Sequence, residues 1–213
     1  MDPRLHWEKV YREKNPTQVS WFQADARISR ELIELASPDR SGAILDVGGG
    51  ASTLVDGLLD GGYTQVTVLD ISGAGLEIAQ KRLGTVAARV TWIEADILRA
   101  DLVPQSVDVW HDRAVFHFLT VAVDRARYIA QVRRVLRPGG HVLLATFAED
   151  GPTRCSGLDV VRYSPAHLQR EFGDDFHMVE SRREEHRTPS NAIQLFTWCL
   201  IRYEPRSTTR PAA

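Results

Sequence analysis

The sequence predicts an α/β fold in which a doubly wound, mostly parallel sheet carries helices on both faces. The first indication is an apolar run at residues 44–47 that leads through three glycines into an amphipathic segment at residues 54–59. The second is repetition, because apolar segments of strand length alternate with helical segments as far as residue 147. The length agrees, since 213 residues with 43% hydrophobic composition can bury one sizeable core.

Composition and charge argue against several kinds of partner. The formal net charge is −2, and local arginine runs are followed directly by acids, so nothing favours nucleic acid. Cys155 and Cys199 lack C-x-x-C or metal-ligand spacing, so neither a disulfide framework nor a metal site is predicted. The chain starts without an apolar signal region, and no stretch approaches about 18 apolar residues. We therefore expect a cytoplasmic protein that does not enter a membrane.

The first 23 residues are expected to cover the remainder of the chain. Residues 5–14 can form a short helix that stops before Pro16, and an aromatic cluster follows at residues 19–23. This cluster either packs over the edge of the core or places Trp21 or Phe22 against a cationic group of a bound cofactor. Both interpretations can hold together.

A strand, a glycine turn and a helix form the centre of the predicted fold. A helix at residues 28–35 leads into the strand at residues 44–47. The glycines at residues 48–50 have no Cβ, so the backbone can fold tightly and a ligand can lie against it. A cofactor site is expected at this turn.

Two acids decide which cofactor is favoured. The apolar strand at residues 66–69 ends in Asp70, whose carboxylate can accept both hydroxyl groups of a ribose. That feature alone fits a dinucleotide equally well. Asp46 separates the two, because a nicotinamide fingerprint usually has an apolar residue there, whereas a buried acid needs a cationic partner or several donors. S-adenosylmethionine carries both an ammonium and a sulfonium.

The following units complete the sheet. Three polar residues, His111, Asp112 and Arg113, come directly after the fourth predicted strand. Because ligands sit at the carboxyl ends of strands in a doubly wound sheet, all three are expected to face the cleft. The expected elements are a helix from Ser72 to Gly84, strands at 90–94 and 106–110, a helix from Asp124, a helix stop and turn at 137–140 and a strand at 142–147.

The C-terminal third closes the predicted domain. The polar stretch 149–163 is expected to be a loop over the cleft. After it, we expect a helix at 165–172 and two strands at 176–181 and 193–202, separated by a charged segment at 182–191. The prediction is one domain over residues 1–203, in which 1–23 form the cover, and a flexible tail at 204–213.

Two motifs resemble the class I S-adenosylmethionine-dependent methyltransferases. Asp46-x-Gly48-x-Gly50 resembles their motif I, although Ser52 stands where the family usually has a third glycine. Leu-Arg-Pro-Gly-Gly at 136–140, followed by an apolar strand, resembles a unit that recurs in the family. The resemblance covers roughly residues 43–147. It implies a Rossmann-like, doubly wound seven-stranded sheet, mostly parallel with an antiparallel edge strand, and S-adenosyl-L-methionine as the cofactor.

The resemblance also implies roles for individual residues. Asp96 would meet the exocyclic amine of adenine and Ile97 would flank the ring, although from its local sequence Asp96 also fits a turn or cap. The segments 7–14 and 20–23 resemble the lysine methyltransferases of citrate synthase and elongation factor 1A, which implies a protein lysine as one acceptor. The expected cofactor-binding residues are Trp21, Asp46, Gly48, Gly49, Gly50, Asp70, Ile71, Asp96 and Ile97.

Methyl transfer requires an acceptor held roughly 3 Å from the methyl carbon and, where needed, a group that takes a proton. An acid at the position of Asp112 resembles the acid in the related lysine enzymes, so Asp112 and His111 are the expected catalytic residues. Alternatively, Asp112 pairs with Arg113 or caps the next turn, and the histidines are packed residues. His186 is expected to overhang the cleft. The expected substrate-binding residues are Arg113, His117, Cys155 and Tyr163, and no metal ligand is predicted.

The predicted function is methyl transfer from S-adenosylmethionine to a nucleophilic N, O or S of a protein lysine or a small molecule. One alternative is a nicotinamide-dependent oxidoreductase, which Asp46 opposes and for which Thr53 replaces an expected glycine. A second alternative is a cofactor-binding module without turnover. An assay of S-adenosylhomocysteine production would separate methyl transfer from the second alternative.

Overall fold

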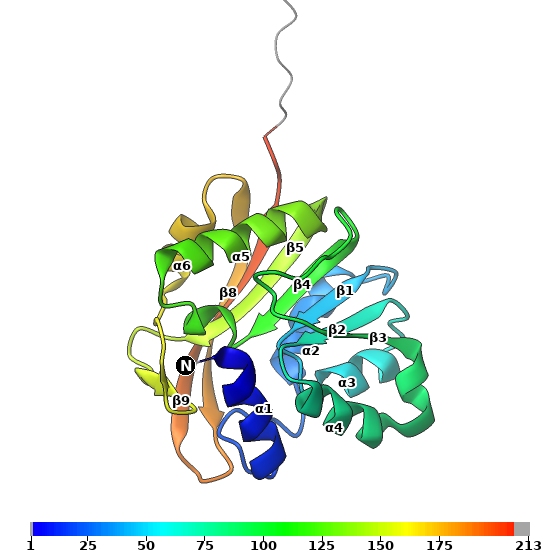
Figure 1. Ribbon diagram of the computed structural model, residues 1–213. Helices are drawn as coiled ribbons and strands as arrows, with labels where there is room; N and C mark the ends of the chain where they lie inside the picture. Colours follow the sequence, from blue (N-terminus) through cyan, green and yellow to red (C-terminus); the bar gives the residue numbers. More distant parts are fainter. Residues whose placement is uncertain (1, 207–213) are drawn as a thin grey trace, which may run out of the picture.

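The computed structural model describes residues 2–206 and contains a seven-stranded sheet in the order β3-β2-β1-β4-β5-β9-β8 (Figure 1). Strands β1 to β5 run parallel, β9 runs antiparallel to β5, and β8 runs antiparallel to β9. The predicted doubly wound, mostly parallel sheet with an antiparallel strand near one edge is therefore confirmed. The strands are β1 (Ile44–Val47), β2 (Val66–Asp70), β3 (Val90–Glu94), β4 (Val107–Arg113), β5 (Leu136–Phe147), β8 (Phe176–Arg187) and β9 (Ile193–Tyr203).

Helices cover both faces of the sheet, and an apolar cluster on each side joins the sheet to the helices of that side. One cluster includes Leu32, Leu58 and Leu76 from the helices on the first face. The other includes Ile129 and Leu168 from the helices on the second face. The helices are α1 (Pro3–Glu13), α2 (Arg27–Ala36), α3 (Leu54–Asp60), α4 (Gly73–Leu83), α5 (Ala122–Val135) and α6 (Pro165–Phe172), with 3-10 turns η1 (Gly84–Arg89) and η2 (Phe116–Phe118).

Helix α1 begins at Pro3, two residues before the predicted start at residue 5. The Asp2 side chain accepts a hydrogen bond from the Arg4 backbone N–H at 2.9 Å, and Pro3 occupies the first turn. Glu8 then ties α1 to the start of α4, since its Oε2 accepts from Ser72 Oγ at 2.7 Å and from the Ala74 N–H at 3.2 Å. These bonds hold the N-terminal helix over the carboxyl ends of the parallel strands.

Two strands are longer than predicted, β4 at its C-terminal end and β5 at its N-terminal end. β4 continues to Arg113, and β5 begins at Leu136, so residues 137–140 form an irregularity within the strand instead of a separate turn. The predicted helix stop is nonetheless correct, because α5 ends at Val135.

The charged segment 182–191 was expected between the last strands, but β8 extends through it to Arg187. Its alternating side chains find partners outside their own strand. Glu184 accepts from Trp198 Nε1 at 2.8 Å, and Arg182 donates to Glu31 at 2.6 Å. Charged side chains with partners are therefore compatible with an edge strand. The prediction that the charged segment separates the two strands was wrong as far as Arg187.

The predicted loop 149–163 contains a short hairpin, β6 (Arg154–Cys155) and β7 (Leu158–Asp159). The predicted tail falls mostly on residues 207–213, which lie outside the described part of the chain. Along residues 2–206, no helix is both long and apolar enough to cross a membrane.

Candidate functional site

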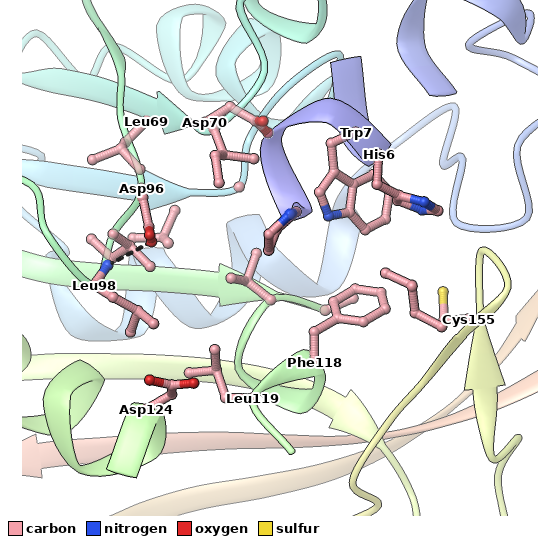
Figure 2. Close-up of a pocket in the computed structure, with 18 of the residues that line it drawn as sticks. His6, Trp7, Leu69, Asp70, Asp96, Leu98, Phe118, Leu119, Asp124 and Cys155 are labelled. Carbon is pink, nitrogen blue, oxygen red and sulfur yellow. Dashed lines mark hydrogen bonds between the residues drawn. The ribbon is translucent and has the colours of Figure 1, made fainter. Parts of the chain in front are cut away.

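A cavity of about 440 Å³ lies at the carboxyl ends of the parallel strands, beneath α1. A smaller chamber of about 50 Å³ adjoins it and shares Tyr11, Trp21, Val47, Gly48 and Arg113 as lining residues. Figure 2 shows Asp70, Asp96 and Leu98 on one side of the large cavity and His6, Trp7, Phe118 and Cys155 on another. We call the part lined by these last four residues the aromatic lobe.

The glycine turn has the tight geometry that the sequence predicts. Gly48 and Gly50 have φ angles of +69° and +40°, which favour glycine. A Cβ on Gly49 would lie 2.5 Å from Asp46 Oδ2, and a Cβ on Gly50 would lie 2.8 Å from Asp70 Oδ2 and overlap the Tyr11 hydroxyl. The absent side chains thus let the two acids and the cover helix meet at one turn.

Asp70 ends β2 at the wall of the large cavity and is 5% exposed. It accepts a hydrogen bond from the Ser72 N–H at 2.8 Å. Burial raises the pKa of Asp70 to about 7, with a further contribution from the charge of Asp46, while backbone donors oppose the shift. The backbone donors therefore do not offset the effect of burial, and hydroxyl groups of a ligand would favour the ionised carboxylate further.

Asp46 lies in the wall of the small chamber and is also buried. Its Oδ1 lies 2.7 Å from His111 Nδ1, and His111 Nε2 lies 3.0 Å from Ser29 Oγ. Its Oδ2 is buried with no hydrogen-bond partner among residues 2–206. Because a buried acceptor is unfavourable without a donor, this atom fits an ammonium brought by a ligand.

His111 was predicted as a catalytic base, and the structure places it elsewhere. It lines the small chamber and not the large cavity, and both ring nitrogens already have partners. The geometry makes it the residue that orients Asp46.

Asp96 and Ile97 follow β3 and line the large cavity, as does Ile71 after β2. Asp96 Oδ1 also accepts from the Leu98 N–H at 2.9 Å, so both roles considered for this residue fit its position (Figure 2). Trp21 lines both chambers, whereas Phe22 lines the small one.

Asp112 does not face the cleft, contrary to the prediction. It is fully buried and lines neither chamber. Its carboxylate accepts from the Val115 N–H at 2.8 Å, the Phe116 N–H at 3.0 Å and the Tyr128 hydroxyl. The reason is strand geometry, because β4 continues to Arg113 and side chains alternate, so Asp112 points to the face opposite His111 and Arg113. Burial raises its pKa to about 6 despite these donors.

His117 and Tyr163 were expected to bind substrate, but both are fully buried and line neither chamber. The His117 ring packs 4.5 Å from Phe118 and 4.9 Å from Phe147 between ring centroids, and burial lowers its pKa to about 3. Tyr163 packs 5.5 Å from Phe116 behind the cavity. For the histidine, the alternative of a packed residue is the one observed.

Arg113 and Cys155 do line the large cavity, as expected. Arg113 Nη1 donates to the Trp21 carbonyl at 2.9 Å. Burial raises the pKa of the Cys155 thiol to about 11, so the thiol is protonated at neutral pH. His186 lies outside both chambers, and its Nε2 contacts the Ser20 carbonyl at 2.8 Å, which fixes the N-terminal segment to β8.

Several residues that line the cavity were not among the predicted site residues. His6, Trp7 and Tyr11 project from α1, and Phe118 projects from η2. The Trp7 ring lies 5.6 Å from Trp21 and 5.3 Å from Phe118. The aromatic spacing along α1 was a usable signal, because it marked the face that now covers the cavity.

Residues 44–140 match the family described as "Methyltransferase domain". The chain is 21% identical over 209 residues to the eEF1A lysine and N-terminal methyltransferase of Mus musculus, covering 94% of this chain and 28% of that protein. It also resembles the SAM-dependent methyltransferase from Anabaena variabilis (TM-score 0.73, 16% identity, 96% of each chain). The N-methyltransferase NodS from Bradyrhizobium japonicum, solved with S-adenosyl-L-homocysteine, gives a TM-score of 0.72 at 15% identity, covering 95% of this chain and 98% of that one.

The fold, the glycine turn with its two acids and the match of residues 44–140 to a methyltransferase domain together support a class I, S-adenosylmethionine-dependent methyltransferase. This outcome favours the first prediction over the nicotinamide alternative. The chain spans about 28% of the length of the eEF1A methyltransferase relatives that it matches.

Proposed function

We propose that this chain binds S-adenosylmethionine in the large cavity and the small chamber and transfers its methyl group to a nucleophilic N, O or S of an acceptor. The observation that carries the proposal is the pair of buried carboxylates on either side of the glycine turn. Asp46 Oδ2 has no partner among residues 2–206, and Asp70, at the wall of the large cavity, has a pKa raised by burial despite its backbone donors. An ammonium and a ribose are the two groups that would satisfy them.

The remaining cofactor contacts follow from the lining residues. Asp96 and Ile97 would hold the adenine, Ile71 would lie beside the ribose, and Trp21 would face the sulfonium where the two chambers meet. Gly48 and Gly49 would let the methionine portion approach the backbone. When bound, the cofactor would supply an activated methyl group that needs no further activation by the protein.

The aromatic lobe is the proposed acceptor site. Trp7 and Phe118 would enclose an acceptor and exclude water, and Cys155 lies at the wall of the lobe. Arg113 lines the same cavity. Holding the acceptor in line with the methyl group accounts for most of the required catalysis. Asp112 keeps a structural role in this account. His6 lines the lobe and could take a proton, because burial and Lys14 lower its pKa.

Two acceptor classes follow from different observations. The relatives named as eEF1A lysine and N-terminal methyltransferases favour a protein amine. The largely aromatic lobe, as part of a cavity of about 440 Å³, favours a small molecule.

The proposal is tested by incubating the protein with S-adenosylmethionine and an acceptor panel and measuring S-adenosylhomocysteine. The panel contains eEF1A and small amines, hydroxyls, thiols and carboxylic acids. Production with one acceptor above the acceptor-free rate supports methyl transfer. Tight binding of the cofactor without production by any acceptor would favour the non-catalytic module.

A further inference from the structure

Arg113 brings a positive charge to the wall between the two chambers. Nη1 donates to the Trp21 carbonyl at 2.9 Å, and the guanidinium carbon lies 4.6 Å from the centroid of the Phe196 ring. Nε and Nη2 are buried and have no hydrogen-bond partner among residues 2–206. The cation is therefore oriented by its neighbours but is not neutralised by them.

The acid that acts most strongly on Arg113 is already engaged. Glu184 opposes the effect of burial, which lowers the pKa of Arg113. Its carboxylate, however, accepts from Trp198 Nε1 at 2.8 Å and from Gln23 Nε2 at 3.1 Å. A largely buried cation of this kind is expected to take an anionic partner from a ligand.

The other charged groups near the aromatic lobe do not offset Arg113. Asp124 and Asp159 line the cavity but pair with Arg127 at 3.2 Å and Arg154 at 3.1 Å. His6 is neutral at neutral pH, because burial and Lys14 lower its pKa. These groups thus leave the positive charge of Arg113 uncompensated, and a bound sulfonium would add a second positive charge.

Arg113 lines both chambers, so the carboxylate of the cofactor and one of the acceptor are the two candidate anions, and the direction of the guanidinium favours the acceptor. The proposed cofactor contacts follow β1, β2 and β3. Arg113 ends β4 and stacks on Phe196 of β9, so its guanidinium points toward the opposite half of the sheet. Its charge also acts on Cys155, which lines the aromatic lobe.

We propose that the acceptor is a small molecule with an apolar or aromatic body and a carboxylate, and that Arg113 pairs with this carboxylate. The inference rests on the proposed function and narrows its acceptor class. One guanidinium with two free N–H directions matches one carboxylate. A lysine ammonium would instead meet a like charge at the same wall.

The test uses the full chain saturated with S-adenosylhomocysteine. Benzoate, phenylacetate and indole-3-acetate are titrated by calorimetry against their matched amides, with wild type, Arg113→Met, Arg113→Lys and the control Arg183→Met. Arg183 is an exposed arginine on β8 paired with Asp150. At least one acid should bind wild type about tenfold or more tightly than its amide. Arg113→Met should abolish that preference, Arg113→Lys should retain part of it, and the control should keep it in full.

Three results would overturn the inference. They are no binding by any acid of the panel, equal binding of acids and amides, or an acid preference that survives in Arg113→Met. The affinity for S-adenosylhomocysteine itself is the separate readout, and it should change less than about twofold in Arg113→Met, with a melting temperature no lower than that of wild type. A tenfold loss would assign Arg113 to the cofactor carboxylate instead, and absence of binding by wild type would refute the proposed function independently.

Discussion

At the scale of single residues, the site depends on acids whose surroundings differ. Asp46 and Asp70 are buried at the walls of the two chambers, whereas Asp112 is buried among three protein donors and lines neither chamber. Burial is common to all three, so burial alone does not identify a binding residue. Their position at a chamber wall distinguishes the first two, and Asp46 also has an oxygen without a donor among residues 2–206.

Asp70 should make cofactor affinity depend on pH. Hydroxyl donors favour the ionised carboxylate, and the pKa of Asp70 is about 7 in the free protein. Affinity for S-adenosylhomocysteine should therefore rise by up to about tenfold per pH unit below 7 and level off above it. Calorimetry from pH 5.5 to 8.5 measures this dependence.

Two variants test whether Asp70 causes it. Asp70→Asn should flatten the curve, and Asp70→Ala should weaken binding at least about tenfold at pH 8. Asp60 is an exposed acid, so the control Asp60→Ala should match wild type. A wild-type curve as flat as that of Asp70→Asn would contradict the assignment.

The same acid should lower the stability of the free protein as the pH rises. The pKa of Asp70 is raised in the folded state above its unfolded value, so the folded state binds the proton more tightly between about pH 4 and 7. Stability from this group is complete below that window and declines through it by up to about 1.4 kcal/mol per pH unit. Urea unfolding of wild type and Asp70→Asn should give curves that diverge in favour of the variant toward pH 7. Parallel curves would rule out a shifted pKa.

Asp112→Asn should act on folding and not on the cofactor. An amide offers one acceptor where the carboxylate serves three donors, so a buried donor loses its partner. The expected loss is about 1–3 kcal/mol in the free energy of unfolding, with S-adenosylhomocysteine affinity within about twofold of wild type. Chemical denaturation and calorimetry on one preparation test both parts. Wild-type stability with slow turnover would restore Asp112 to a catalytic role.

At the scale of elements, the sequence predicted the features that depend on neighbouring residues and missed those that depend on packing between distant segments. The turn from β1 to α3 could be predicted from the spacing of its glycines. The positions of Asp46 and Asp70 could be predicted because each lies at or next to the end of an apolar strand segment. The side-chain directions of Asp112 and His117 could not, because they depend on how far β4 continues and on what packs behind it. Pairing across the sheet equally determined the length of β8, which its own charged sequence did not indicate.

Helix α1 should contribute to cofactor binding as an element. It supplies His6, Trp7 and Tyr11 to the cavity wall, and Tyr11 lies against Gly50 and Gly75. Deleting residues 2–23 should weaken S-adenosylhomocysteine binding at least about tenfold while the circular dichroism of the sheet persists. Tyr11→Ala should produce part of that loss with a smaller change in structure. Unchanged affinity in the truncated protein would reduce α1 to a packing element.

At the scale of the whole molecule, the sheet order explains why one end carries the site. β1 lies between β2 and β4, so Asp46, Asp70 and Arg113 reach the same edge from three adjacent strands. Helices on both faces bury the sheet, and the large cavity lies at the carboxyl ends of the strands, where residues of α1 and the β6–β7 hairpin line it. In the proposed arrangement, the cofactor would lie over the ends of β1–β3 and the acceptor beside Arg113 at the end of β4.

The central claim is that this edge holds S-adenosylmethionine and not a nicotinamide dinucleotide. Thermal unfolding of the full chain with S-adenosylhomocysteine or NAD at matched concentrations tests it most directly. A ligand at about a hundred times its dissociation constant adds roughly 2.7 kcal/mol, which corresponds to a rise of roughly 5–10 °C for a chain of this size. The account predicts that rise with S-adenosylhomocysteine, none with NAD, and its loss in Asp70→Ala. Stabilisation by NAD alone would contradict it.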